Sequence, residues 1–473
     1  MLFNSIEFLI FFPVVTLLYF LLPFKFRWAL LLSASCFFYM FFKPVYILIL
    51  FFTIIIDYFA GIYLEEITDL KKRKWFLVAS LIANIGVLAI FKYYNFLNEN
   101  INDLSQIFGF KNQLPYLDIL LPIGLSFHTF QAMSYTIEVY RGNQKAERHF
   151  GIYALYVMFY PQLVAGPIER PQNIINQFHV KHNFNYKNAV NGLNLIVYGF
   201  FKKLVIADRL SVYVNHVYGD INHASTISVL IACVFFSIQI YCDFSGYTDI
   251  ARGTARFMGF ELLLNFNRPY LSKSIGEFWS RWHISLSTWF RDYLYIPLGG
   301  SRNGKTKWYR NLIIVFLVSG LWHGANWTFI VWGALHAAYI VFELATKNIR
   351  NKALVLFNIK EDGLLIKYFY RTIVFTAVSF AWIFFRSPSI HDAMQIISKI
   401  TAFDFSLNLT QISAEKGPLN LLLSFLVIGL LILSYKLPVE LNIKRNITFI
   451  TIVTFLILVL GKDGAAEFIY FQF

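Results

Sequence analysis

The sequence predicts an all-α protein that crosses a membrane many times. Of its 473 residues, 57% are hydrophobic and only 14% are charged. Soluble domains carry about 25% charged residues, so this chain has too few charges to cover a water-facing surface. In addition, apolar runs near the roughly 20 residues that a helix needs to cross the hydrocarbon core recur along most of the chain.

These runs predict about eleven or twelve helical segments in a single integral membrane domain over residues 1–473, with its core motifs at 120–345. Several segments are too short to cross a membrane alone, which favours a bundle around a funnel or tunnel. The predicted apolar segments are 6–23, 28–42, 45–64, 75–91, 116–140, 152–168, 190–207, 226–246, 311–320, 368–385, 419–437 and 447–460.

The net charge of +14 lies in short clusters between the apolar runs. Such clusters are typical of cytoplasmic anchors under the positive-inside rule, and they argue against a nucleic-acid partner. The run KKRK at 71–74 predicts a cytoplasmic loop after the third span. Counting back three crossings places the N-terminus outside the cytoplasm and leaves Lys25 and Arg27 inside.

Two segments carry polar or helix-breaking residues at membrane depth. FYPQLVAGPIERP at 159–171 predicts a re-entrant piece that lines protein or a watery cavity. The span 226–246 ends near Asp243, which has two interpretations. It is either an interfacial cap or part of the polar wall of a tunnel, where it would contact substrate.

The stretch 275–293 fits one helix with an apolar stripe and a second, polar line. The polar line contains Ser280, His283, Ser287 and Arg291. One interpretation is an interfacial helix anchored by tryptophans. A different interpretation is a substrate path, in which His283 has a catalytic role and Ser287 and Arg291 bind substrate.

The basic loop that follows contains Arg302 and Lys305. These side chains could contact the phosphates of a nucleotide-containing donor such as coenzyme A. The loop could equally be a plain cytoplasmic anchor.

His323 lies about twelve residues beyond this loop, or about 18 Å along a helix, which is near the middle of a bilayer. An imidazole there can accept the proton of a hydroxyl that attacks a thioester or ester. Trp322 and Asn326 could pack an acyl chain or support the oxyanion. A second interpretation is a structural histidine satisfied by a neighbouring helix.

Several common chemistries have no motif in this sequence. It contains no P-loop, GxGxxG or HExxH pattern and no serine in a GxSxG elbow. Its three cysteines lack a metal-type spacing. We therefore predict neither a metal site nor a hydrolase-type nucleophile.

Ordered motifs along nearly the whole chain carry a resemblance to a known family. They are PIGLSFHTF at 122–130, YPQLVAGPIERP at 160–171, DFSGYTDIARG at 243–253, RWHISLS at 281–287, WHGANW at 322–327 and FIYFQF at 468–473. The chain resembles the membrane-bound O-acyltransferase superfamily. It is most similar to the bacterial branch that includes alginate O-acetylation proteins and the membrane component of peptidoglycan O-acetyltransferases.

The resemblance implies a ring of helices around a tunnel, with His323 of the WHG motif as the catalytic residue. His283 of the RWHISLS motif is then the second signature residue. It also implies acetyl-CoA as a cytoplasmic donor, no bound cofactor, and a separate extracytoplasmic acetyltransferase of the SGNH type as partner.

The resulting hypothesis is a multi-pass O-acetyltransferase of the cytoplasmic (inner) membrane that serves an extracytoplasmic polysaccharide. Peptidoglycan is favoured over alginate, because the composition is typical of AT-rich genomes whereas the best-known alginate producers are GC-rich. Two competing hypotheses are D-alanyl transfer to teichoic acid and a non-catalytic transporter with His323 in its pore.

Overall fold

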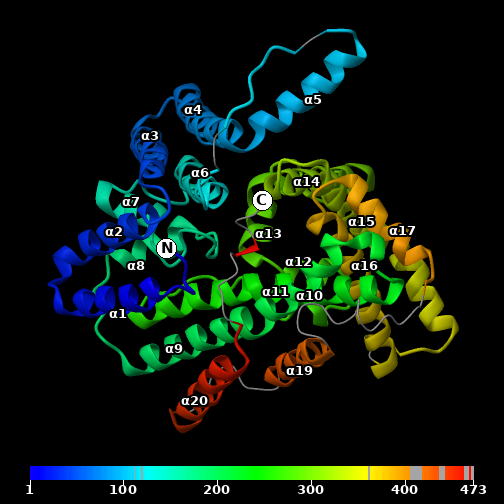
Figure 1. The fold of residues 1–473 in the computed structure, drawn as a ribbon. Coiled ribbons are helices and arrows are strands. Elements are labelled where there is room, and N and C mark those ends of the chain that lie inside the picture. The colour runs from blue at the N-terminus through cyan, green and yellow to red at the C-terminus, as the bar shows by residue number, and fades with distance from the viewer. Residues whose placement is uncertain are drawn as a thin grey trace. The chain divides into compact units, whose positions relative to one another are not determined.

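The computed structural model describes residues 1–110, 112–118, 121–360, 363–404, 418–435, 443–462 and 468–469. Every regular element in these ranges is a helix, which confirms the predicted all-α class (Figure 1). Of the family motif at 468–473, only the first two residues lie within the described part. The end of the predicted segment 419–437 and residues 119–120 of the segment 116–140 also lie outside it.

The chain divides into two compact units. Unit 1 comprises Met1–Phe200, Tyr247–Leu263 and Glu440–Phe455, and unit 2 comprises Phe201–Gly246, Leu264–Val439 and Leu456–Phe473. Helix α11 (Thr226–Met258) supplies residues to both. The single domain expected over residues 1–473 stays a prediction.

Helices long and apolar enough to cross a membrane confirm a multi-pass protein. In the described part of the chain there are six, at Pro44–Glu66, Leu70–Ile107, Tyr186–Gly219, Thr226–Met258, Trp327–Leu356 and Leu364–Arg386. Three shorter apolar helices lie at Ile6–Leu21, Leu419–Ser434 and Asn446–Leu460. The remaining predicted segments correspond to shorter or more polar helices.

Unit 1 contains most of the N-terminal helices. They are α1 (Ile6–Leu21), α2 (Phe24–Met40), α3 (Ile47–Glu66), α4 (Leu70–Leu88), α5 (Tyr94–Ile107), α6 (Leu125–Arg141), α7 (Phe150–Met158), α8 (Pro171–Phe178) and α9 (Tyr186–Phe200), together with the first part of α20 (Ile443–Leu460). A 3-10 turn at Pro44–Tyr46 and a π-turn at Ala89–Tyr93 join some of them.

A buried carboxylate ties α3 to α4. Asp57 is fully buried and accepts hydrogen bonds from the Ser80 hydroxyl at 2.5 Å and from Asn84 Nδ2 at 2.9 and 3.0 Å. In an apolar surrounding such bonds hold helices together, because the polar groups lose water as a competing partner.

The predicted segment 152–168 is interrupted, as the prolines and glycine of FYPQLVAGPIERP predict. Helix α7 ends at Met158, and the irregular segment that follows is buried through Glu169. Protein groups satisfy the carboxylate at its end: Glu169 accepts from the backbone N–H of Leu263 and from Asn173 Nδ2, both at 2.6 Å. Irregular backbone of this kind is tolerated at membrane depth only where protein or a cavity surrounds it.

Unit 2 contains the central motifs. Its helices are α10 (Asp208–Gly219), α12 (Ile275–Arg281), α13 (Ile284–Phe290), α14 (Lys305–His323), α15 (Trp327–Leu356), α16 (Leu364–Arg386), α17 (Ile390–Thr401) and α19 (Pro418–Ser434). π-turns lie at Phe201–Ala207 and Arg291–Tyr295, and 3-10 turns at Ile221–His223 and Pro269–Leu271.

The single helix predicted over 275–293 is wrong. The chain breaks at Trp282 and His283, where His283 has φ 44° and ψ 54°. This left-handed conformation interrupts the helical repeat, so the predicted polar line does not exist as one face.

Two glycines allow α14 and α15 to pack closely against each other. A Cβ added at Gly320 would lie 2.3 Å from the carbonyl oxygen of Phe329, and one at Gly333 would lie 2.4 Å from that of Phe316. Because the obstacles are backbone atoms, neither helix can move a side chain aside to admit a methyl group.

We therefore predict that Gly333→Ala lowers the stability of the protein in detergent by about 1–3 kcal/mol, as overpacking does. Gly86→Ala on α4 is the matched control, since a Cβ there would meet no heavy atom within 4 Å among the described residues. Alanine is favoured over glycine in a helix by about 1 kcal/mol, so the control should melt at the same temperature or higher. Equal melting temperatures of the two variants would contradict the close crossing.

Candidate functional site

His323 ends helix α14 inside a cage of aromatic rings. Its side chain is buried, and its ring centroid lies 5.0 Å from that of Trp322, 4.9 Å from Trp332 and 5.3 Å from Phe385. Gly324 follows directly, and a Cβ there would lie 2.0 Å from the Phe329 ring. The WHG motif therefore needs its glycine so that an aromatic ring can pack against the backbone beside His323.

His283 lies at the break between α12 and α13 and is fully buried. Asn265 holds this break together. Its backbone carbonyl accepts from the N–H of Ile284 at 2.9 Å. Its Oδ1 accepts from the N–H of Ser285 at 3.2 Å and from the Ser285 hydroxyl at 2.9 Å. These bonds satisfy backbone donors at the start of α13 that have no partner within the helix.

The same amide determines the tautomer of His283. A backbone N–H can only donate, so the Asn265 atom facing Ser285 must be the oxygen. His283 Nδ1 lies 3.1 Å from that oxygen and must therefore carry a proton, which leaves the lone pair on Nε2. Burial lowers the pKa of His283 to about 3, so the imidazole is neutral at physiological pH.

Trp322 brings the two histidines into one cluster. Its ring centroid lies 6.1 Å from that of His283 and 5.0 Å from that of His323. The sequence predicts that these two histidines lie at different depths in the membrane. In unit 2 both imidazoles lie beside the same indole ring, that of Trp322.

His336 extends the cluster, and the sequence prediction missed it. It is fully buried, 4.9 Å from the Trp332 ring and 5.0 Å from the Trp279 ring. Trp279 Nε1 donates to its Nδ1 at 3.3 Å, which places the proton on Nε2. The sequence signal that could have identified His336 is its position in the middle of an apolar run, four residues after Trp332.

The remaining predicted substrate residues have structural contacts. Asn326 caps α15: its Oδ1 accepts from the N–H of Thr328 at 2.9 Å, and its Nδ2 donates to the Pro388 carbonyl at 2.8 Å. The Ser287 hydroxyl donates to the Trp282 carbonyl at 3.2 Å. The exposed Arg291 pairs with Asp292 at 2.8 Å. The structure thus brings Trp322 to the histidines but gives Asn326, Ser287 and Arg291 different partners.

Asp243 belongs to a buried charge cluster with Lys203 and Asp208. Its Oδ1 accepts from Lys203 Nζ at 2.5 Å, and its Oδ2 accepts from the backbone N–H of Ile469 at 2.8 Å. Lys203 also pairs with Asp208 at 2.9 Å. Both carboxylate oxygens of Asp243 are engaged, which favours an anchoring position over the wall of a tunnel.

Arg302 and Lys305 are exposed, as a phosphate-contacting loop requires. Lys305 and His323 are the first and last residues of α14, and the helix rise separates them by about 27 Å. A donor that contacts this loop would therefore have to reach His323 along the length of a helix.

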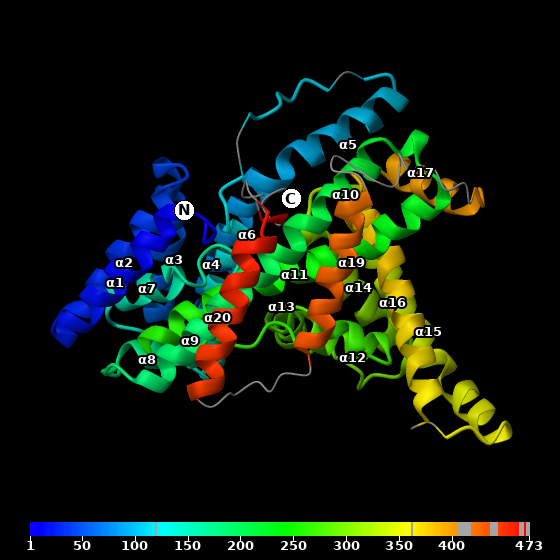
Figure 2. The same ribbon diagram turned by 60° about the horizontal axis from the view of Figure 1, so that its bottom comes forward.

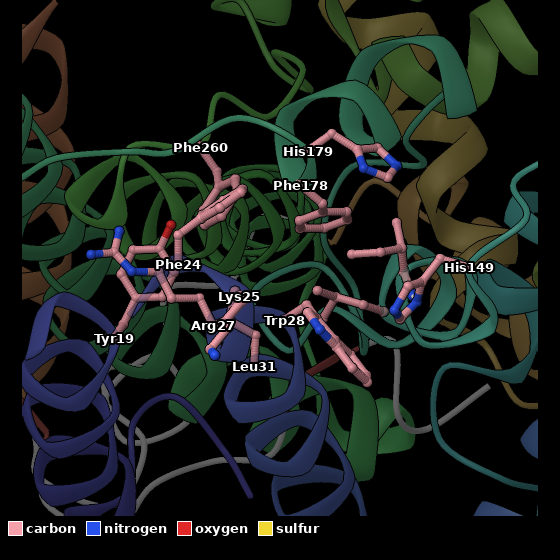
Figure 3. Close-up of a pocket in the computed structure, with 12 residues that line it drawn as sticks. Tyr19, Phe24, Lys25, Arg27, Trp28, Leu31, His149, Phe178, His179 and Phe260 are labelled. Carbon is pink, nitrogen blue, oxygen red and sulfur yellow. The ribbon is translucent and has the colours of Figure 1, made fainter. Parts of the chain in front are cut away.

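Unit 1 contains a cavity of about 210 Å³ whose lining includes none of the predicted residues (Figure 3). Its cationic side chains are engaged with protein. The Arg27 guanidinium stacks on Tyr19 at 4.8 Å and donates to the carbonyl of Leu22 at 3.1 Å. His179 Nε2 lies 2.7 Å from a Glu147 carboxylate oxygen. These contacts favour a packing role for the basic groups there.

Comparison with known proteins places these motifs in one family. The model of the membrane-bound O-acyltransferase family matches residues 144–386, which include all three buried histidines of the cluster in unit 2. The chain belongs to this family. It is therefore an acyltransferase. The family and the acyltransferase activity predicted from its motifs are confirmed.

Relatives match most of the chain. The chain is 36% identical over 439 residues to a protein of Azotobacter vinelandii named "Probable alginate O-acetylase AlgI", covering 91% of this chain and 84% of the relative. It is 35% identical over 449 residues to the peptidoglycan O-acetyltransferase of Helicobacter pylori, covering 88% and 82%. A teichoic acid D-alanyltransferase of Bacillus subtilis matches less, at 30% identity over 46% of this chain.

Substitutions at His283 can separate its backbone role from its imidazole. A non-glycine residue in the left-handed conformation costs about 1 kcal/mol, so His283→Gly should melt at a higher temperature than His283→Ala. His283→Asn, which tolerates that conformation, serves as a further control. We expect all three variants to lose most acyl transfer. Full activity in a stable His283→Gly variant would reduce His283 to a structural residue.

Removal of the central cation of the charge cluster should destabilise unit 2. Lys203→Met leaves two buried carboxylates without their cation, a change that typically costs about 3–5 kcal/mol. The matched control is Arg291→Gln, which breaks an exposed ion pair worth less than about 1 kcal/mol. The melting temperature in detergent should fall strongly for the first variant only, and equal shifts would show that the cluster is not a major support.

Proposed function

We propose that this acyltransferase moves acetyl groups from acetyl-CoA in the cytoplasm for the O-acetylation of a polysaccharide outside the cytoplasmic membrane. The names of the relatives support an acetyl group and a polysaccharide acceptor, since both alginate and peptidoglycan enzymes match over most of the chain. The observation that carries the proposal is the position of His323, buried among aromatic rings in the family's WHG motif.

His323 acts as the general base in this proposal. The oxygen of an acceptor hydroxyl attacks the thioester carbonyl carbon while the imidazole accepts the hydroxyl proton. The carbon–sulfur bond then breaks, and the proton passes to the departing thiolate. The surrounding rings of Trp322, Trp332 and Phe385 exclude water, which would otherwise compete with the acceptor for the acetyl group.

His283 supports the same reaction in a second position. Its Nε2 lone pair, imposed by the bond from Nδ1 to Asn265, can accept a hydrogen bond from the acceptor hydroxyl or from the coenzyme A thiol that forms when the carbon–sulfur bond breaks. Both imidazoles lie beside the same indole ring of Trp322, so a substrate bound against this ring would be near both. Asn265 is then a positioning residue for His283.

The proposed orientation follows from the basic clusters. The basic residues 71–74, predicted as a loop, form the start of helix α4 in the structure. These residues and the loop with Arg302 and Lys305 face the cytoplasm under the positive-inside rule, and the N-terminus lies outside. The loop of Arg302 and Lys305 is the proposed contact for the donor's phosphates, and the protein holds no resident cofactor. The hydroxyl that accepts the acetyl group at His323 is then an intermediate acceptor, from which a separate extracytoplasmic acetyltransferase of the SGNH type transfers the acetyl group to the glycan.

Peptidoglycan is the proposed acceptor, and the AT-rich composition supports it over alginate. D-alanyl transfer is the second candidate because a teichoic acid D-alanyltransferase also matches part of the chain. That reaction needs a carrier protein in place of coenzyme A. Labelled acetyl-CoA consumed by membranes that contain the protein would support acetylation. Consumption of a carrier-bound D-alanyl thioester instead would support the second candidate.

The central test measures ester-linked acetate released by mild alkali from purified cell wall. In a deletion strain, His323→Ala and His323→Gln should reduce it about 100-fold or more relative to the wild-type gene, the contribution expected of a general base. His223→Ala is the matched control, because His223 is exposed and pairs locally with Asp220 at 2.7 Å. Normal acetate in a His323 variant present at wild-type levels would exclude catalysis by His323 and favour the transporter hypothesis.

A further inference from the structure

A second cavity in unit 2 has the composition of a lipid site. It has a volume of about 470 Å³ and lies between the start of α12, the second half of α15 and the first half of α16. Helices α15 and α16 run side by side there (Figure 2). The volume falls in the range of cavities that hold small organic ligands. Neither His283 nor His323 lines it.

The walls of the cavity are apolar and open outward. Aromatic and aliphatic side chains line it, including Phe342, Leu354, Phe369 and Ile373. Phe342 is 70% exposed, Phe369 57% and Ile373 48%, on helices apolar enough to cross a membrane. Large apolar side chains exposed on helices that cross a membrane contact hydrocarbon, so these side chains suit an apolar lipid chain.

Three charged side chains line the same cavity: Lys273, Glu343 and Arg350. The carboxylate of Glu343 is already engaged, since its Oε2 accepts from the backbone N–H of Ile275 at 2.6 Å. Arg350 Nη2 donates to the Glu343 carbonyl at 2.8 Å, while its buried Nε has no hydrogen-bond partner among the described residues. The cavity thus offers two cations, one with an unused buried donor, beside one carboxylate occupied by protein.

We propose that this cavity binds an anionic phospholipid, with an acyl chain against α15 and α16 and the phosphate at Lys273 and Arg350. A phosphate supplies the acceptor that Arg350 Nε lacks, and arginine and lysine are the usual partners of lipid phosphates. The bound lipid would brace the start of α12, whose first N–H is held by Glu343. The site does not depend on the proposed acyl transfer, so its test uses binding alone.

The experiment compares lipid adducts by native mass spectrometry of delipidated protein in mild detergent. Phosphatidylglycerol and phosphatidylcholine with identical chains are the two probes. We expect phosphatidylglycerol to bind about tenfold more tightly to the wild type, because each nearby cation favours an anionic lipid several-fold. The double variant Lys273→Gln and Arg350→Gln should lose that preference. Lys352→Gln, on an exposed position of α15 that does not line the cavity, should keep it.

A second variant tests the apolar part. Ala377→Phe fills the cavity without changing its charges, and it should weaken both lipids. Lys273→Gln alone removes only an exposed side chain, so its partial loss of preference can be measured in a folded protein. An unchanged phosphatidylglycerol preference in the double variant, or unchanged binding in Ala377→Phe, overturns the proposal. It is also overturned if inorganic phosphate or acetyl-CoA displaces the lipid at micromolar concentration, which would assign the cavity to a soluble phosphate ligand.

Discussion

The Oδ1 atom of Asn265 accepts hydrogen bonds from the N–H and hydroxyl of Ser285 and lies 3.1 Å from His283 Nδ1. Without these bonds, the left-handed turn at His283 would leave unsatisfied donors in a buried apolar setting, where each missing partner costs more than a hydrogen bond contributes in water. The turn separates α12 from α13, and it directs His283 into the aromatic cluster. Tautomer, ring position and helix break therefore depend on one amide.

The aromatic cluster gives this arrangement its chemical character. The imidazoles of His283, His323 and His336 all lie beside the indole rings of Trp322 or Trp332. Indole rings provide large, rigid surfaces and few competing acceptors. In this apolar surrounding, an imidazole that is neutral and exchanges a proton is more stable than a permanently charged side chain. The same surrounding suits the transfer of an uncharged acyl group.

Several buried charged groups elsewhere in the described part are paired within the protein. The Lys203 ammonium pairs with both Asp208 and Asp243, and Asp243 also accepts from a backbone N–H. Asp57 accepts hydrogen bonds from two side chains of α4. At membrane depth, an uncompensated charge is expensive. Arg350 Nε, like Nε of Arg209 and of Arg252, lacks a hydrogen-bond partner among the described residues, and in the lipid cavity a phosphate would supply one.

The sequence by itself determined the membrane class, most of the helical segments, the interruption of the segment 152–168 and the family, because composition, run length and proline–glycine spacing are local properties. It also singled out His323 and His283 through their motifs. Only the tertiary structure decided that the helix breaks at His283, that His336 joins the cluster and that Asp243 pairs with Lys203. Helical periodicity records neighbours three or four residues apart, whereas Asn265 precedes His283 by 18 residues and Lys203 precedes Asp243 by 40. Contacts over such separations depend on how the helices pack, and no local pattern encodes them.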